Sequence, residues 1–136
     1  MITIPVVCIS GDGIGPEITA AMKKVVGVAT HATECEIEWI DVDVGIKAIE
    51  SEGTALPQKV LDQMRSTGIS IKGPTATPVG GGHRSVNVLL RQSLELYANM
   101  RPIRWFEGID TPIKHPEEVD LTIFRENTED VYAGIE

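Results

Sequence analysis

The start of one predicted helix brings together side chains suited to binding an anion. Ser85, Asn87 and Arg91 offer a hydroxyl, an amide and a guanidinium, and the last two are four positions apart on one helix face. Ser85 is well placed as the N-cap, where free backbone N–H groups and the helix dipole attract negative charge. The same residues would also suit an ordinary capped surface helix with an exposed arginine, so this pattern alone leaves both interpretations open.

Two further arginines lie in or at the end of predicted strands, where a charged side chain is disfavoured unless it is paired or belongs to a site. They are Arg101 and Arg125, and an arginine can bind a carboxylate through two parallel hydrogen bonds. The alternative is that each pairs with a neighbouring acid such as Glu126 or Glu129. Tyr132 follows closely, although a lone tyrosine is usually a packing residue.

A glycine-rich turn occupies residues Gly11 to Pro16, with the sequence GDGIGP. The dinucleotide fingerprint G-x-G-x-x-G would require glycine at position 16, where this chain has Pro16. The segment therefore predicts a tight connection from a strand to a helix, and a nucleotide contact is the less favoured interpretation.

The charge distribution favours a small anion as the ligand. The chain has a net charge of −8, but Glu95 is the only acid between Lys72 and Trp105. The basic residues of this stretch are Lys72, Arg84, Arg91, Arg101 and Arg104. A polynucleotide would need a longer basic stripe, so nucleic acid is not expected as a partner. A chance cluster of solvated charges is the alternative.

Composition argues against several other classes of protein. No apolar run approaches the roughly 20 residues of a membrane helix, so no membrane span is expected. The N-terminus has no basic flank and no cleavage site, and a cytoplasmic location is expected by default. Cys8 and Cys35 are interpreted as small buried hydrophobic residues. The histidines and carboxylates share no metal-ligand spacing, so no metal site is predicted.

The elements that must position these residues alternate between strands and helices. An apolar, β-branched run predicts a central strand over 2–9, and a helix is expected from Pro16. Further strands are expected over 34–41, 68–71, 100–105 and 119–125, with helices over 44–50, 57–66 and 85–96. Residues 73–82 predict an irregular loop. The fold class is α/β, an open sheet with flanking helices, in one domain over 1–136 without an internal boundary.

Four segments, in the same order along the chain, resemble the β-decarboxylating dehydrogenase family. This family includes isocitrate, isopropylmalate and homoisocitrate dehydrogenases. The matching segments are GDGIGPE at 11–17, KGPTATPVGGGHRSVNVLLR at 72–91, LYANMRP at 96–102 and FRENTEDVYAGIE at 124–136. The resemblance spans essentially the whole chain and implies an incomplete part of the isocitrate/isopropylmalate dehydrogenase-like open sheet.

The resemblance also implies roles for individual residues. The substrate would be held by Thr77, Ser85, Asn87, Arg91, Arg101 and Arg125. Tyr132 stands where the family has the tyrosine that donates a proton to the enolate after decarboxylation. The cofactor would contact Ile14, Thr75, Ala76, Thr77 and Asn87. Some relatives have threonine at the position of Ala76, so a hydroxyl contact made there by relatives is missing in this chain.

The implied activity is oxidative decarboxylation of isocitrate to 2-oxoglutarate, a reaction of the tricarboxylic acid cycle, by a homodimer that uses NADP or NAD and Mg²⁺ or Mn²⁺. Family members run to several hundred residues, and their lysine base, metal-binding aspartates and adenosine-binding segment would lie beyond residue 136. The chain is therefore expected to be a fragment that is inactive alone. A non-catalytic subunit or a truncated anion-binding module is the alternative.

Overall fold

A computed structural model describes residues 1–76 and 85–128 of the chain. The chain divides into two compact units, Met1–Leu94 and Glu95–Glu136, which are described separately. The first unit contains β1 (Ile2–Ile9), α1 (Gly15–His31), β2 (Cys35–Asp41), α2 (Ile46–Glu52), α3 (Gln58–Thr67), β3 (Ser70–Lys72) and α4 (Val86–Ser93). The second contains β4 (Ala98–Arg104), the 3₁₀ turn η1 (Pro116–Glu118) and β5 (Asp120–Glu126). Since compact units can belong to one domain, the expected single domain stays a prediction.

The first unit is built on a parallel sheet of three strands in the order β2-β1-β3. Strand β1 is central and pairs with both neighbours, so that Ile9 lies beside Lys72 at the carboxyl end of β3. The chain continues from β2 to β3 across β1, which makes the carboxyl end of the β1–β3 pair a topological switch point. The expected α/β class with a parallel sheet and flanking helices is confirmed.

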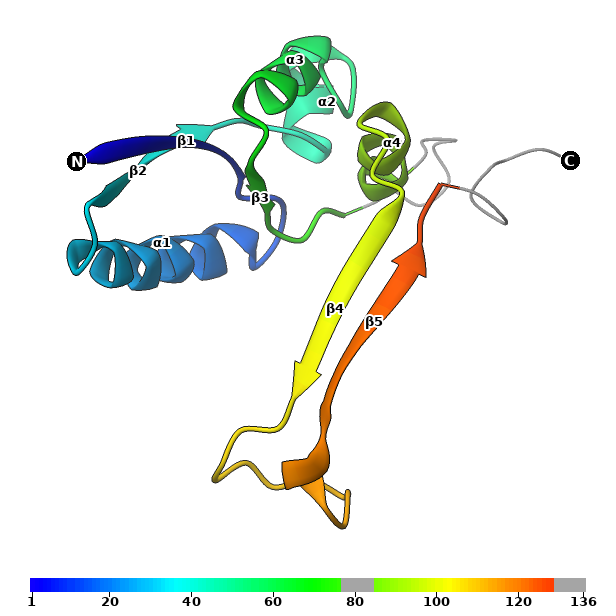
Figure 1. Cartoon of the computed structure of the whole chain (residues 1–136). Coiled ribbons are helices and arrows are strands. Elements are labelled where there is room, and N and C mark those ends of the chain that lie inside the picture. Colours follow the sequence, from blue (N-terminus) through cyan, green and yellow to red (C-terminus); the bar gives the residue numbers. More distant parts are fainter. Residues whose placement is uncertain (77–84, 129–136) are drawn as a thin grey trace, which may run out of the picture. The chain divides into compact units, whose positions relative to one another are not determined.

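Helices cover both faces of this sheet, with α1 on one side and α2 and α3 on the other (Figure 1). Strand β1 supplies the centre of the core because its side chains alternate between the two faces. Val7 and Ile9 belong to the cluster formed with α3 and α4, whereas Cys8 lies on the opposite face. Burial raises the pKa of the Cys8 thiol, which keeps it protonated and apolar in character.

Most of the expected elements are present, with one helix shorter than predicted. Helix α4 ends at Ser93 rather than near Leu96, since Leu94 forms its C-cap and Glu95 adopts a left-handed φ of 52°. On the inner side of the helix, Leu90 is buried and Leu94 packs against the core. In α1, Thr19 is buried, whereas Val25, one of the apolar residues at helical spacing, is largely exposed.

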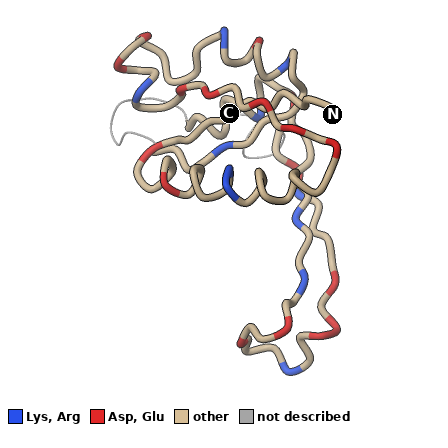
Figure 2. The backbone as a smooth tube through the Cα atoms, turned by 90° about the vertical axis from the view of Figure 1, so that its left-hand side faces the viewer, with Lys and Arg blue, Asp and Glu red and all other residues tan. Residues whose placement is uncertain are grey.

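The second unit is an antiparallel hairpin of β4 and β5, joined by an irregular connection that contains η1 (Figure 1). Arg104 and Asp120 close the loop end of the strands with an ion pair of 3.0 Å. The Trp105 indole N–H donates to the Ile109 carbonyl at 2.8 Å inside the connection. Basic and acidic positions both occur along the hairpin, so its charge is of mixed sign (Figure 2).

Within residues 1–76 and 85–128, no helix has the length and apolar character needed to cross a membrane.

Candidate functional site

The glycine turn after β1 and the segment after β3 are joined at the switch point. The Asp12 backbone N–H donates to the Pro74 carbonyl at 2.8 Å, and the Ala76 N–H donates to Asp12 Oδ2 at 2.8 Å. The Gly73 N–H donates to the Ile9 carbonyl at 2.7 Å, which continues the sheet pairing into the loop. Two segments that the sequence assigned to cofactor contact are therefore held side by side.

Glycine is required at this junction because the two backbones approach closely. A Cβ atom on Gly11 would lie 1.9 Å from the Pro74 carbonyl oxygen, and one on Gly73 would lie 2.2 Å from the Ser10 carbonyl oxygen. Gly11 also has a φ of 76°, which only glycine adopts without strain. The contact with Pro74 therefore accounts for Gly11 of the turn on steric grounds.

Lys72 adds a cation to the junction. Its ammonium group donates to the Gly73 carbonyl at 2.5 Å and lies 3.4 Å from the Thr75 hydroxyl oxygen. Burial lowers the pKa of Lys72, the Asp12 carboxylate opposes this effect, and the nearby Arg91 guanidinium lowers the pKa further. The pKa of Lys72 is therefore affected by a carboxylate of the glycine turn and by a guanidinium of α4.

Helix α4 presents the predicted anion-binding residues beside this junction. Val86 and Leu90 are buried and fix the helix against the core, while Asn87 and Arg91 are partly exposed one helical turn apart. Ser85 occupies the N-cap position as expected, but within the described residues its hydroxyl makes no capping hydrogen bond. That hydroxyl and the Asn87 amide lie near the positive end of the helix dipole, and their binding of an anion stays a prediction.

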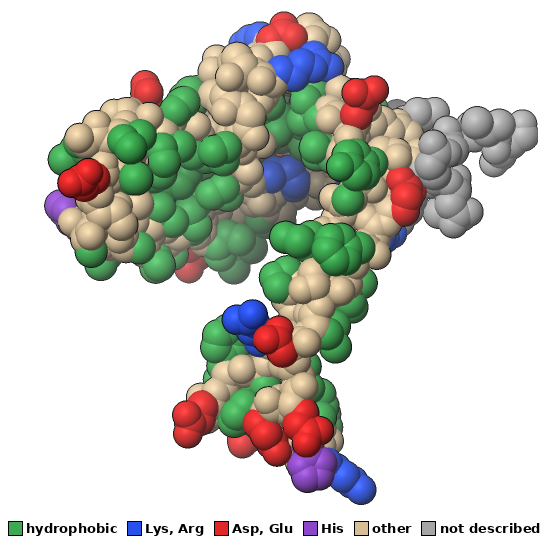
Figure 3. All heavy atoms as spheres, viewed as in Figure 1, with side chains coloured by type: hydrophobic (Ala, Val, Ile, Leu, Met, Phe, Trp, Pro, Cys, Tyr) green, Lys and Arg blue, Asp and Glu red, His purple; other side chains and the backbone are tan. Residues whose placement is uncertain are grey.

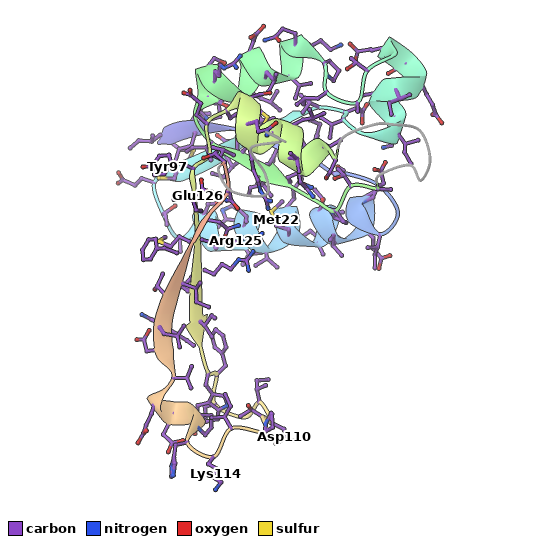
Figure 4. All side chains as sticks on the ribbon, turned by 90° about the vertical axis from the view of Figure 1, so that its right-hand side faces the viewer. Met22, Tyr97, Asp110, Lys114, Arg125 and Glu126 are labelled. Carbon is purple, nitrogen blue, oxygen red and sulfur yellow. The ribbon has the colours of Figure 1, made fainter. Side chains whose placement is uncertain are left out.

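The hairpin places Arg101 and Arg125 on the same face. Arg125 lies directly opposite Asn99, and Arg101 lies directly opposite Ile123, so the four residues share one side of the strands. The Arg101 Nε–H donates to Asn99 Oδ1 at 3.1 Å, which makes an amide rather than an acid its partner within the described residues. Glu126 neighbours Arg125 in β5 and so alternates to the other face (Figure 4).

The candidate residues fall into separate groups. The first unit collects Ile14, Thr75, Ala76, Ser85, Asn87 and Arg91 around the switch point and α4. Arg101 and Arg125 form the second group, on the hairpin. Thr77 and Tyr132 lie outside the described residues, and their roles stay predictions.

Sequence reasoning did not assign Lys72, Asp12 or Asn99 to the site. Lys72 could have been found as the first residue of the basic stretch, directly before the Gly-Pro loop. Asp12 carries no such signal, because its importance comes from a contact with residue 76 that only the folded chain creates. The relation of Asn99 to the two arginines follows from the cross-strand register, which the sequence alone does not give.

Among residues 1–76 and 85–128, no group of three or more His, Cys, Asp or Glu side chains is arranged to hold a metal ion. The expectation that metal ligands lie elsewhere in a longer protein stays a prediction.

Comparison with known proteins identifies the family. The model of the isocitrate/isopropylmalate dehydrogenase family matches residues 5–136. The chain is 51% identical over 131 residues to "Isocitrate dehydrogenase [NADP]" of Staphylococcus aureus (strain N315), covering 94% of this chain and 31% of that protein. It is 53% identical over 133 residues to the protein of the same name from Pseudomonas aeruginosa, covering 94% of this chain and 32% of that protein.

Solved structures agree with this result. The crystal structure of isocitrate dehydrogenase from Methylococcus capsulatus matches with a TM-score of 0.83 and 49% identity, over 97% of this chain and 37% of that chain. A β-decarboxylating dehydrogenase from Thermococcus kodakarensis matches with a TM-score of 0.74 and 28% identity, over 93% of this chain and 34% of that chain. The chain thus spans about a third of the length of the curated relatives it matches. It belongs to the isocitrate/isopropylmalate dehydrogenase family.

Proposed function

We propose that this chain supplies the N-terminal part of an NADP-dependent isocitrate dehydrogenase, an oxidoreductase that converts isocitrate to 2-oxoglutarate. The observation that carries the proposal is the junction of the glycine turn with the loop after β3, where the Lys72 ammonium group lies beside the Gly73 carbonyl and the Thr75 hydroxyl. This cationic junction occurs in a chain 51% identical to a relative named as an NADP-dependent isocitrate dehydrogenase.

The substrate is a tricarboxylate, and its binding requires several fixed cations. Arg91, Arg101 and Arg125 each offer a planar fork that matches a carboxylate. The Ser85 hydroxyl and the Asn87 amide add hydrogen-bonding groups near the start of α4. In this proposal they bind the carboxylate that distinguishes isocitrate from 3-isopropylmalate.

The residues present also fit contact with a dinucleotide. Ile14 exposes 61% of its surface on the glycine turn, and among the described residues other than its chain neighbours no atom lies within 4 Å of where a Cβ of Gly13 would stand. An apolar side chain beside an open backbone suits a flat aromatic base. Thr75, Ala76, Thr77 and Asn87 complete the proposed cofactor-binding set.

The chain's own residues bind and orient the substrate and move one proton. When bound, NADP would accept the hydride that leaves the hydroxyl-bearing carbon, a base outside this chain would take the hydroxyl proton, and the resulting β-keto acid would lose carbon dioxide. The Tyr132 phenol then donates its proton to the enolate carbon, which completes 2-oxoglutarate. We assign Mg²⁺ or Mn²⁺ binding to residues outside this chain, and a cytoplasmic homodimer as the active form.

A truncated anion-binding module is the second candidate, favoured by the fact that the chain spans 31% of its Staphylococcus aureus relative.

A chimaera distinguishes the two proposals. In this chimaera, residues 1–136 replace the matching segment of that relative. The proposed function predicts isocitrate-dependent NADP reduction by the chimaera with Mg²⁺, and none by the 136-residue chain alone, because a catalytic site acts as a unit.

The unmodified Staphylococcus aureus relative is the positive control for this assay. A folded chimaera without isocitrate-dependent NADP reduction would leave the anion-binding module as the better description. Reduction of NADP by the isolated chain would contradict the assignment of essential residues to other parts of a longer enzyme.

A further inference from the structure

Asp12 holds the loop after β3 at more than one point. Its backbone N–H donates to the Pro74 carbonyl at 2.8 Å, and its carboxylate accepts the Ala76 N–H at 2.8 Å. Its own carbonyl accepts the Gly15 N–H at 2.9 Å, which anchors the same residue to the first turn of α1. One residue therefore connects the start of α1, through its backbone, to the loop after β3, through its backbone N–H and its carboxylate.

The surroundings of the Asp12 carboxylate fit its length closely. Oδ2 lies 3.0 Å from the position that a Cβ of Gly45 would take, so a glycine leaves the space that the carboxylate fills. Gly45 itself is fixed by its N–H, which donates to the Ala55 carbonyl at 2.8 Å. Burial lowers the pKa of Lys72, and the negative charge of Asp12 opposes that shift. The carboxylate is thus packed against the backbone that enters α2 while it accepts the Ala76 N–H.

We propose that Asp12 is a positioning residue that fixes the segment Lys72–Ala76 relative to the glycine turn. By fixing this segment, Asp12 aligns Thr75 and Ala76 with substrate and cofactor. This inference rests on the proposed function, because the alignment matters only if the loop contacts the reacting molecules. In this role Asp12 acts through its hydrogen bond to the Ala76 amide and not on the reacting atoms.

The physical reason is the sensitivity of reaction geometry to small displacements. Without the carboxylate, the Ala76 N–H loses its acceptor and the loop is held chiefly by its backbone bonds at Gly73 and Pro74. A shift on the order of 1 Å at reacting atoms can cost about 100-fold in rate. The loss should fall mainly on kcat, while the arginines that bind the substrate keep the KM for isocitrate nearly constant.

The test uses the chimaera and compares Asp12→Ala with the conservative Asp12→Asn. Asparagine keeps an oxygen that can accept the Ala76 N–H, so it should restore kcat to within about threefold of the unsubstituted chimaera. The alanine variant should lower kcat by roughly 10- to 100-fold. Asp62→Ala is the matched control, because Asp62 is a carboxylate on the surface of α3 that bonds Gln58 and Arg65.

Amide hydrogen exchange at Ala76 supplies a second readout that does not depend on activity. The Ala76 amide should be protected in the unsubstituted chimaera and in Asp12→Asn, and should exchange faster in Asp12→Ala only. If Asp12→Ala leaves both kcat and exchange unchanged, Asp12 positions nothing. Equal losses of kcat in both variants would also overturn the proposal, since the charge and not the acceptor would then matter. Failure of the proposed function would look different. The unsubstituted chimaera would then be inactive, while the Ala76 amide would still exchange faster in Asp12→Ala than in Asp12→Asn.

Discussion

Arg101 and Arg125 show how residue-scale predictions gain precision from the fold. Both were candidates because an arginine within a strand needs a partner or a site. The hairpin adds that they share one face, with Asn99 opposite Arg125 and bonded to Arg101 at 3.1 Å. This arrangement directs two guanidinium groups to the same side of the strands, as recognition of a polycarboxylate requires.

We therefore predict that Arg101→Ala or Arg125→Ala in the chimaera lowers kcat/KM for isocitrate by at least about 2 kcal/mol, roughly 30-fold. Each substitution leaves a carboxylate of the substrate without its fork. Steady-state kinetics measure the effect. Arg104→Ala is the control, because Arg104 lies on the opposite face of β4 and pairs with Asp120. Similar small effects at all three positions would mean that the arginines of the hairpin are structural.

The contacts of the residues that sequence reasoning missed are not encoded by a local pattern, even where the residue itself, as with Lys72, stands in a recognisable basic stretch. Ser85, Asn87 and Arg91 were recognisable because helical spacing places them together. Asp12 bonds a backbone amide 64 positions away, and the closeness of Lys72 to Arg91 depends on how α4 packs. Such partners follow from tertiary structure, which residue type and spacing do not specify.

At the scale of elements, the glycine turn is the most tightly constrained connection of the first unit. Gly11 and Gly53 both have positive φ angles, of 76° and 72°. Of the two, Gly11 faces a steric barrier, whereas no atom of the described part of the chain, apart from its chain neighbours, lies within 4 Å of where a Cβ of Gly53 would stand. Substitution of Gly53 therefore measures the cost of backbone strain alone, whereas substitution of Gly11 measures strain together with a steric clash.

We predict that Gly53→Ala destabilises the chain by about 1 kcal/mol, the cost of a left-handed residue with a side chain. Gly11→Ala should cost at least about 3 kcal/mol, because the loop at Pro74 must also move. Urea unfolding of the 136-residue chain, followed by circular dichroism, measures both values. Equal losses of stability would show that the turn and the loop are not in close contact.

Periodic elements were predictable, whereas their ends and pairings were less so. The apolar run of β1 and the alternation in β2 identified both strands, because burial on two faces or on one leaves a clear pattern. The predicted end of α4 was too late along the chain. The left-handed conformation that follows the helix is adopted by Glu95, whereas glycine or asparagine is the usual residue at such a position. The antiparallel pairing of β4 with β5 required the structure, as the connection between them is long and irregular.

At the scale of the whole molecule, the hairpin has little apolar burial of its own. Tyr97, Met100, Phe106 and Phe124 each expose more than 60% of their surface. Hydrophobic side chains are accordingly visible over much of its surface (Figure 3). An isolated two-stranded hairpin is at best marginally stable in water. The curated relatives are about three times as long as this chain, so in those proteins further residues are available to pack against the apolar surface of the hairpin.

This exposure predicts a difference in amide hydrogen exchange. In the 136-residue chain, amides of β4 and β5 should exchange faster than those of the buried β1. In the chimaera, exchange in both hairpin strands should slow at least about tenfold, while β1 changes little. Exchange measured by mass spectrometry on the two proteins compares the same peptides. Hairpin amides as protected in the short chain as in the chimaera would show that the hairpin is stable without further chain.

The central claim, that this chain forms the anion-binding part of an isocitrate dehydrogenase, is tested most directly by substrate preference. The chimaera should prefer isocitrate over 3-isopropylmalate by a factor on the order of 10³ or more in kcat/KM, because polar groups built to bind a carboxylate are left unpaired by an isopropyl group. Replacing Ser85 and Asn87 together with leucine should erode this preference chiefly by damaging isocitrate turnover. A chimaera that oxidises both acids with equal efficiency would contradict the account and leave Ser85 as a helix cap.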